Sequence, residues 1–535
     1  MFKKKEQKKE KALSTKFTVV FWLIVILLVF VGVALYVSLM PFNIHSFNFW
    51  FVIDVAVSAI CFIAIIVKSG TNIFHKQKIF DKAEKRLLLA IIFCNVLLVI
   101  GSFIGTPLLG GLNDYKNRME PITSDLTILD EFDESQVQII DKDSATSLGD
   151  RVFGELGSET VSQFDVSDNY ASVVVNGTMY RLTPVEYSGF VKWISTRKNG
   201  IPGYISVNVT TGEALFHKVS SGMKYSPGAY LNEDLYRHIY FKYPTLILGN
   251  SKFEVDDNWN PYWVTQVLSY TWVDKAKDVK GVVITDPVTG DVQYYDADKA
   301  PAWVDNIYDA KLICDQYTDY SRYQHGLVNI SKKGVTTTTE DYAYLQRNGQ
   351  LYIYTGITSV GNDESNVGFI YASLHSKEIL YFVSAGAEEF SARASAEGAV
   401  QEKRYNSIFP TMVMINGEPV YFMGLKDNAG LIKSYAFVSY KNYQTVGIGS
   451  SVQEALIAYK KAAGATTGGD SEEKAIIVAD VKTAVINGNT IYYIRTEDDQ
   501  YYQVSINVSD MLPFVEAGDE LNVVISGSTI TQIKH

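Results

Sequence analysis

The chain has 535 residues, of which 47% are hydrophobic, and a formal net charge of −11. The charge is unevenly distributed: residues 1–109 hold 13 basic and 5 acidic residues, and residues 110–535 therefore carry −19. An acidic surface of that size repels polyanions, which excludes nucleic acid as a partner of the larger part. Because Cys314 is the only cysteine after residue 109, an internal disulfide is excluded there as well.

Three apolar stretches lie within the first 109 residues, at 17–40, 49–67 and 87–109. Each reaches the length of about 20 residues that a helix needs to cross a bilayer. The first stretch is longer than the apolar part of a signal peptide and lacks a small-x-small cleavage site, so we expect it to be retained. The sequence therefore predicts a basic tail over 1–16 and three transmembrane helices over 17–109.

The distribution of Lys and Arg predicts the orientation of these helices. Seven lysines precede residue 17, six basic residues lie between the second and third stretches, and none lies between the first and second. Basic flanks stay in the cytoplasm, so we expect a cytoplasmic N-terminus and extracytoplasmic residues 110–535. A large exterior part without disulfides favours a Gram-positive bacterium as the source.

Two polar residues, Asp54 and Asn95, interrupt the apolar stretches. An ionisable residue within a span is a functional hypothesis by default. Asp54, however, lies roughly 9 Å from the outer end of its helix at 1.5 Å per residue, where it can snorkel or pair with His45. Asn95 can donate a hydrogen bond across helices. We favour structural roles for both residues.

Residues 110–165 are acidic, with a short helix expected after Asp141, and we expect them to act as a neck that spaces the globular part from the membrane. From residue 166 onwards, apolar and polar residues alternate as in β-strands. Asn-Gly pairs, which favour two-residue hairpin turns, interrupt this pattern at 176–177, 348–349, 416–417 and 487–488.

Two segments of this region are similar to one another. Residues 203–213 and 281–291 each combine a glycine, a strand and a Thr-Gly-acid turn at the same spacing; the matching residues are Gly203, Thr211, Gly212 and Glu213, and Gly281, Thr289, Gly290 and Asp291. A weaker copy runs from Gly368 to Glu378, and the weakest covers 434–444. An aromatic strand precedes each copy, so the pattern predicts a repeated unit of strand, connection, strand, tight turn and strand.

Helices are expected over 390–403 and 451–463, where Ala and other apolar residues recur at helical spacing. Residues 464–473 are a Gly- and Thr-rich linker. Residues 474–535 contain five short apolar runs, which predict a small β-barrel of the OB or SH3-like kind.

The strings at 207–214 and 285–292 resemble the closing hairpin of PepSY domains, whose typical ending is Val-Asp-Ala-x-Thr-Gly-Glu. Asp286 keeps the Asp of that ending, whereas Asn208 replaces it. The resemblance covers about half of residues 166–463. It implies tandem antiparallel-sheet-plus-helix modules, with a first pair over 166–310 and a second over 311–463. It also implies non-enzymatic modules that bind or restrain partners, often proteases or envelope enzymes.

Signatures of catalysis do not emerge from the sequence. The histidines lack zinc-binding spacing, and neither a Gly-x-Ser-x-Gly elbow nor a phosphate-binding Gly-Lys-Ser/Thr loop occurs, so we predict no catalytic residue, metal site or cofactor. Two aromatic clusters are candidates for glycan or peptide contact, although packing within strands and loops is the favoured alternative. They comprise Trp259, Tyr262 and Trp263, and Tyr317, Tyr320 and Tyr323.

Together these features predict an α+β protein with three N-terminal transmembrane helices, tandem modules and a C-terminal barrel. The function we expect is that of a membrane-anchored extracytoplasmic scaffold of the bacterial cell envelope, which binds envelope proteins or wall polymer. Two alternatives remain open: an ectoenzyme that hydrolyses wall material or peptides, and an accessory subunit of a membrane transporter.

Overall fold

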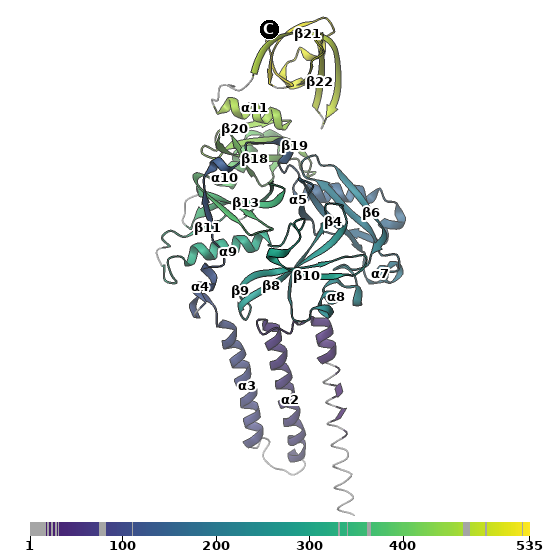
Figure 1. Cartoon of the computed structure of the whole chain (residues 1–535), viewed down its shortest axis with the longest axis vertical. Coiled ribbons are helices and arrows are strands. Elements are labelled where there is room, and N and C mark those ends of the chain that lie inside the picture. The colour runs from purple at the N-terminus through teal and green to yellow at the C-terminus, as the bar shows by residue number, and fades with distance from the viewer. Residues whose placement is uncertain are drawn as a thin grey trace, which may run out of the picture.

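The computed structural model describes residues 18, 21–22, 25–26, 29, 31–73, 82–109, 111–329, 332–339, 341–360, 365–463, 471–486, 489–526 and 528–534. Two long helices extend from a body of four antiparallel sheets, and a small barrel follows the body in the sequence (Figure 1). The predicted α+β class agrees with this arrangement. The predicted basic tail 1–16 and most of the predicted linker lie outside the described residues.

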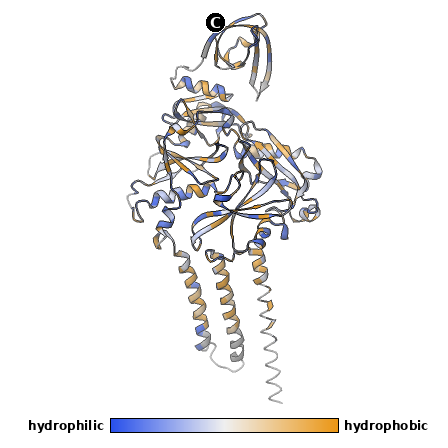
Figure 2. Cartoon of the chain, viewed as in Figure 1, coloured by the Kyte–Doolittle hydropathy of each residue, from blue (hydrophilic) through white to orange (hydrophobic). Residues whose placement is uncertain are grey.

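The prediction of three transmembrane helices is corrected by the structure. Among the described residues, two helices are long and apolar enough to cross a membrane: α2 (Phe47–Ile73) through Phe47–Ile65, and α3 (Lys82–Phe103) through Lys85–Phe103. The described residues of the first predicted stretch include the helix over 31–38 and yield no third candidate span. Figure 2 shows the apolar residues along α2 and α3.

Four sheets form the body, and most of their neighbouring strands are antiparallel and consecutive in the sequence. The first holds β2 (Phe164–Val166), β3 (Ala171–Val175), β4 (Thr178–Tyr187), β5 (Ile201–Asn208) and β6 (Ala214–Met223). The second holds β7 (Ile247–Val255), β8 (Pro261–Trp272), β9 (Lys275–Thr285) and β10 (Val292–Asp296). The Asn-Gly pair at 176–177 forms the β3–β4 turn, with positive φ at both residues as a type I′ turn requires.

The third sheet holds β11 (Thr336–Thr338), β12 (Ala343–Arg347), β13 (Gln350–Ser359), β14 (Ser365–Ser373) and β15 (Ile379–Ala387), with β1 (Ile122–Ser124) added in parallel at the β15 edge. The fourth holds β16 (Asn406–Ser407), β17 (Thr411–Ile415), β18 (Glu418–Lys426), β19 (Ile432–Ser439) and β20 (Val446–Gly449). The Asn-Gly pairs at 348–349 and 416–417 form the β12–β13 and β17–β18 turns.

Helices lie before, within and between the sheets. They are α4 (Leu112–Lys116), α5 (Lys142–Gly154), α6 (Ser158–Val161), α7 (Phe190–Thr196), α8 (Leu235–Lys242), α9 (Ala310–Tyr323), α10 (Glu389–Ala399) and α11 (Val452–Ala462). The predicted helices after Asp141, over 390–403 and over 451–463 correspond to α5, α10 and α11. Asp141 caps α5 by accepting a hydrogen bond from the Ser144 N–H, and Ser451 caps α11 in the same way from Glu454.

The sheets share hydrophobic cores. One cluster joins Val173 of the first sheet, Phe253 of the second and Phe437 of the fourth, and another joins Phe369 of the third sheet to Tyr421 of the fourth. A core shared in this way buries a sheet face that a lone sheet would expose. The described residues of 164–449 therefore form one packed body.

Residues 119–140 also belong to this body, where a neck that spaces it from the membrane was expected. Val137, Ile139 and Ile140 are buried, and the Ile139 and Ile140 N–H groups donate to the Val209 carbonyl at 2.9 and 2.8 Å. We call residues 122–140 the strap, because they run from the third sheet past the fourth to the first.

The predicted C-terminal barrel is confirmed. Five strands close in the order β21 (Ser471–Ile486), β22 (Asn489–Thr496), β23 (Tyr501–Ser505), β25 (Thr529–Lys534) and β24 (Glu520–Ser526). Each overlaps one of the five apolar runs of the sequence. The Asn-Gly pair at 487–488 lies outside the described residues.

Candidate functional site

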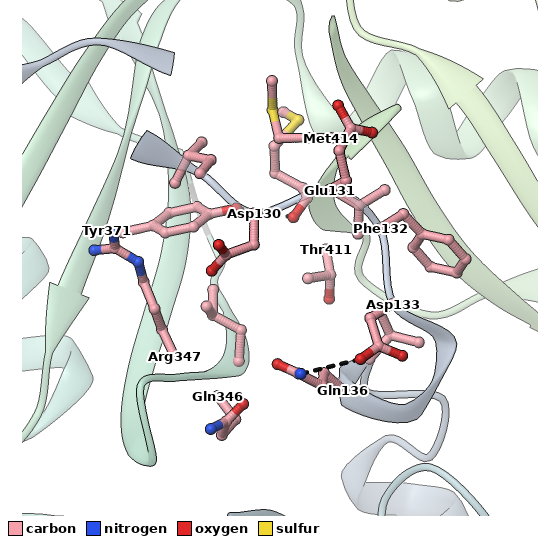
Figure 3. Close-up of a pocket in the computed structure, with 15 residues that line it drawn as sticks. Asp130, Glu131, Phe132, Asp133, Gln136, Gln346, Arg347, Tyr371, Thr411 and Met414 are labelled. Atoms are coloured by element: carbon pink, nitrogen blue, oxygen red, sulfur yellow. Dashed lines mark hydrogen bonds between the residues drawn. The ribbon is translucent and has the colours of Figure 1, made fainter. Parts of the chain in front are cut away.

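A small cavity lies where the strap crosses between the third and fourth sheets (Figure 3). In this view Tyr371 and Arg347 of the third sheet approach from one side and Glu131 and Phe132 of the strap from the other. The cavity measures about 80 Å³. Its polar lining comprises Asp130, Glu131, Asp133, Gln136, Gln346, Arg347, Tyr371 and Thr411.

The strap is tied to the fourth sheet at this point. The Phe132 N–H donates to the Met414 carbonyl at 2.8 Å, and the Glu131 carboxylate accepts from the backbone N–H groups of Asn416 and Gly417 at 2.9 and 2.7 Å. These two N–H groups belong to the turn between β17 and β18, so Glu131 caps that turn with charge-assisted hydrogen bonds. The Phe132 ring packs edge-on against Phe437, with 5.2 Å between ring centroids.

Contacts to the third sheet complete the crossing. Arg347 Nη2 donates to the Ile128 carbonyl at 3.1 Å, and the Tyr371 hydroxyl donates to the Met412 carbonyl at 2.9 Å. Burial raises the pKa of Tyr371 above its ordinary value, which keeps the hydroxyl a donor. Arg347 Nε and Gln346 Oε1 are buried and have no protein partner among the described residues. Polar atoms of this kind make the cavity a suitable place for ordered water.

Two of the three carboxylates that line the cavity, Glu131 and Asp133, accept hydrogen bonds from nearby turns. Asp133 accepts from the Ser135 hydroxyl and N–H at 2.7 and 2.9 Å, and these hydrogen bonds lower the pKa of Asp133. Glu131 is held by the β17–β18 turn. Pockets for small-molecule ligands usually measure about 300–1,000 Å³. A cavity of about 80 Å³ bordered by capping carboxylates serves best to fix the strap between two sheets.

A second cavity, of about 350 Å³, lies between α2 and α3 and includes Asp54 in its lining. Asp54 is half-buried, and among the described residues no hydrogen bond or ion pair joins it to His45. Asn95 donates to the Ile91 carbonyl at 2.9 Å within its own helix and approaches Ser58 Oγ of α2 at 3.5 Å. Asn95 therefore lies at the contact between the two helices, and Asp54 faces an apolar groove.

The residues of the predicted repeat turn adopt one geometry in three sheets. The side chain of Asn208 accepts from the Thr210 and Thr211 N–H groups, and Asp286 accepts likewise from Val288 and Thr289. The Ser373 hydroxyl plays the same part for the two residues that follow Leu374. The left-handed position is occupied by Gly212, Gly290 and Lys377, and the acidic residue that closes each turn is Glu213, Asp291 or Glu378.

The glycine that opens each copy also has a shared environment. A Cβ at Gly203 would lie 2.1 Å from the His217 carbonyl oxygen, and one at Gly281 would lie 2.1 Å from that of Tyr295. For Gly368 the corresponding distance, to Phe382, is 2.3 Å. These positions need glycine because the neighbouring strand approaches closely. Common ancestry of the segments, and the relation to PepSY domains, stay predictions.

The six aromatic residues proposed for partner contact differ in burial and in their packing partners. Trp263 and Tyr317 are 1% and 4% exposed, so they belong to the core. Tyr262 packs against Trp303, Tyr320 against Tyr317, and Tyr323 against Tyr115. The cluster around Tyr317 lies on α9, a helix that we did not expect, because tyrosines stand where aliphatic residues usually mark the buried face.

Trp259 takes part in an arrangement that the sequence did not reveal. The His217 ring lies between the rings of Tyr204 and Trp259, with centroid distances of 4.8 and 4.6 Å and interplanar angles of 5° and 11°. His217 Nε2 is 2.8 Å from Ser206 Oγ. Burial lowers the pKa of His217, so the imidazole favours its neutral form. These residues are separated by up to 55 positions, and no local motif joins them.

A buried carboxyl pair was likewise missed. Glu254 of β7 is 0% exposed and accepts from the Asp305 and Asn306 N–H groups at 2.8 and 3.1 Å. Asp305 is 5% exposed and accepts from the Val174 N–H at 2.6 Å. Burial raises the pKa of Glu254 to about 7, and burial together with the neighbouring Glu254 raises the pKa of Asp305. The pair fixes the segment before α9 to the first and second sheets.

On the barrel, β22 and β23 present aromatic and basic side chains side by side. Arg495 is paired across the strands with Tyr501, and Tyr493 with Gln503. Tyr493 and Tyr501 are 40% and 69% exposed. Exposed aromatic rings beside polar groups suit contact with a sugar or a polypeptide. Among the described residues no group of three or more His, Cys, Asp or Glu side chains is arranged to hold a metal ion.

Comparisons with known proteins add no family. Neither a protein-family model nor a curated protein matches the sequence. Among solved structures the chain is similar to an exo-β-1,3-galactanase variant from Phanerochaete chrysosporium with β-1,3-galactotriose, at 11% identity over 74% of this chain and 69% of that one, with a TM-score of 0.18. It is also similar to a levansucrase mutant from B. megaterium, at 9% identity over 79% of this chain and 96% of that one, with a TM-score of 0.17. Similarity at these TM-scores carries no argument about fold or function.

Proposed function

We propose that this protein is a membrane-anchored, extracytoplasmic scaffold of the bacterial cell envelope that binds envelope proteins or wall polymer. The observation that carries the proposal is the pair α2 and α3. Its 19-residue apolar windows are only 11% and 0% buried, although each is long enough to span a bilayer. Apolar helices with so little protein cover are suited to lipid.

The direction of the pair supports the extracytoplasmic placement. The start of α2 contacts the body, as does Gly105 just after α3, so Ile73 at the end of α2 and Lys82 at the start of α3 lie at the opposite end of the pair. Six basic residues lie between or near these two residues in the sequence: Lys68, Lys76, Lys78, Lys82, Lys85 and Arg86. Basic residues favour the cytoplasmic side, which supports an exterior position for the body.

The barrel offers the best surface for a partner, because Tyr493 and Tyr501 are exposed on adjacent strands beside the half-buried Arg495. Two experiments test the proposal. In a cysteine-free full-length background, a cysteine at Tyr443, which is 44% exposed on the body, should react with an impermeant thiol reagent on intact cells. Failure to react unless the cells are opened would contradict the exterior placement.

The second experiment tests partner binding. Crosslinking in cells should recover the same envelope protein or wall polymer repeatedly with the wild-type chain and much less with Tyr493→Ser/Tyr501→Ser. The matched control is Phe390→Ser on α10, a side chain that is 75% exposed and far along the chain from the barrel. Equal recovery from all three proteins would remove the barrel from the proposal, and repeated recovery of nothing would contradict a binding role.

One observation favours the accessory-subunit alternative. Asp54 lines the groove of about 350 Å³ between α2 and α3, where a carboxylate is expected to be paired or functional. If the groove receives a helix of a transporter, Asp54→Asn should abolish copurification with that transporter and leave the amount of protein in the membrane unchanged. Unchanged copurification would contradict this alternative.

A further inference from the structure

Six large apolar side chains are exposed around the ends of α2 and α3 that join the body. They are Phe42, Ile44, Trp50, Leu231, Phe241 and Trp272, and their exposed fractions range from 40% for Trp50 and Trp272 to 61% for Ile44. We call them the base surface. They come from the loop over 39–46, from α2, from the segment around 231, from α8 and from the end of β8.

Hydrogen bonds hold these segments together at one end of the body. The Phe42 N–H donates to the Pro244 carbonyl at 2.8 Å, and Asn43 Nδ2 donates to that of Thr245 at 3.1 Å, which places the loop beside the end of α8. The Asp274 N–H donates to the His45 carbonyl at 3.0 Å, which adds the tip of the β8–β9 hairpin.

The base surface also reaches α3 and the helix over 31–38. The Trp272 side chain packs so closely on Gly105 that a Cβ there would lie 2.1 Å from Trp272 Cγ. Arg237 stacks on the Tyr36 ring at 4.5 Å and donates through Nη1 to the Leu231 carbonyl at 2.7 Å. The segments that carry the base surface therefore lie at the end of the body that α2 and α3 join (Figure 1).

Leu231 also has an unusual backbone conformation. Its φ of 55° lies in the left-handed region, which is unfavourable for a non-glycine residue. The Leu231 side chain is 52% exposed, so this apolar residue can contact groups outside the body.

The dimensions of the spans identify that contact. The 19-residue window of α3 ends at Phe103 and, at 1.5 Å per residue, covers roughly 28 Å, close to the bilayer core of about 30 Å. The core boundary therefore falls at Phe103, two residues before Gly105 and its contact with Trp272. A further zone of roughly 5–8 Å on each side contains the lipid headgroups.

We propose that the base surface lies in the headgroup zone of the bilayer that α2 and α3 span, so that phospholipid covers it. This inference rests on the membrane placement given under the proposed function. Trp and other aromatic side chains are favoured in this zone. The body then sits directly on the membrane, with its orientation fixed by both the helices and the base surface.

The test uses full-length protein with Cys61→Ala, Cys94→Ala and Cys314→Ala, reconstituted in nanodiscs of phosphatidylcholine with phosphatidylglycerol. Nitroxide labels are placed singly at Phe241→Cys, at Ile44→Cys as a second base position, at Leu97→Cys within α3, and at Phe390→Cys on the body. Collision with oxygen reports lipid, and collision with a water-soluble nickel chelate reports water.

We expect the ratio of oxygen to nickel collisions to be highest at 97, several-fold lower at 241 and 44, and lowest at 390. If the collision ratios at positions 241 and 44 equal the ratio at position 390 while position 97 reports lipid, this inference is overturned and the proposed membrane anchor stays intact. A water-exposed 97 would contradict the anchor and the inference with it.

Discussion

Asp274, at the tip of the β8–β9 hairpin, holds the first residue of α2 in place. Its Oδ1 accepts from the Phe47 N–H at 3.3 Å, and its own N–H donates to the His45 carbonyl at 3.0 Å. A residue 227 positions away in the sequence thus supplies an N-terminal cap for α2. The same hairpin tip places Val273 in the groove between α2 and α3. Through these contacts the second sheet is joined directly to the helix pair.

Replacement of Asp274 by Ala should weaken the contact between the β8–β9 hairpin and the start of α2. Loss of a side-chain cap costs about 1 kcal/mol, which corresponds to roughly fivefold faster hydrogen exchange of the Phe47 amide. Asp274→Asn is the matched control, because Asn keeps an acceptor and tolerates the left-handed φ of 50°. Exchange rates at Phe47 that do not differ between the Ala and Asn variants would show that the cap contributes nothing.

Glu131→Ala should release the strap from the β17–β18 turn. The carboxylate accepts two backbone N–H groups but is exposed to solvent, so we expect a loss of about 1 kcal/mol or less. Hydrogen exchange of the Asn416 and Gly417 amides should be faster in Glu131→Ala than in the wild type. Glu131→Gln retains one acceptor oxygen, so its exchange rates should lie between those of the wild type and Glu131→Ala. Unaltered exchange in Glu131→Ala would mean that Phe132 alone holds the strap.

The Glu254–Asp305 pair predicts a pH dependence of stability. The pKa of Glu254 is about 7 in the folded protein and 4.5 as its ordinary value, so the folded state binds more protons between these pH values. The free energy of unfolding should therefore fall as pH rises from about 4.5 to about 7. Urea midpoints measured across this range should fall less steeply for Glu254→Gln, which cannot ionise. An identical slope in both proteins would show that Glu254 titrates normally.

His217 predicts the opposite slope. Burial between two rings lowers its pKa below 6.5, so the unfolded state binds more protons in the interval between the folded pKa and 6.5. The stability that His217 contributes is complete above pH 6.5 and is lost as pH falls through the folded pKa. His217→Phe keeps a stacked ring and should remove this component from the urea midpoints. An NMR titration of His217 centred at or above 6.5 would contradict the assignment.

Gly203→Ala should be strongly destabilising, because its Cβ would meet a backbone carbonyl that cannot rotate away. Overpacking of a well-packed strand typically costs about 1–3 kcal/mol. The control is Gly154→Ala in α5, where nothing lies within 4 Å and alanine favours the helix. Denaturant midpoints for the two variants should shift in opposite directions; a wild-type midpoint for Gly203→Ala would show that β5 and β6 separate freely.

The parts of the fold that could be predicted are those with local signals. The barrel strands alternate in hydrophobicity, α5 and α11 begin with capping residues, and the Asn-Gly pairs mark two-residue turns, so each is readable within a short window. The helix α9 was missed because Tyr317 and Tyr320 stand at its inner positions and tyrosine favours strands. The strap was read as a spacer because its acidic residues suggest solvent, whereas Glu131 and Asp133 use their charge to cap backbone N–H groups.

The candidate site and the buried polar groups depend on contacts between distant residues. Glu131 meets a turn 285 positions away, and Glu254 meets Asp305 across 51 positions. Neither pairing has a sequence motif, and only the order of the sheets brings the partners together. The same reason explains why Trp259 was proposed as a contact residue although its ring covers His217.

The strap also determines when the body can complete its folding during synthesis. Residues 122–140 leave the ribosome early, but their partners at Leu380, Met414 and Asn416 are made roughly 260–290 residues later. At about 5–20 residues per second, this delay lasts from about 13 s to about a minute. Throughout it, apolar residues such as Phe132 and Val137 have no fourth sheet to cover them. The strap therefore stays uncovered until the fourth sheet has been made, and during this period its apolar residues are exposed to proteases and to other chains.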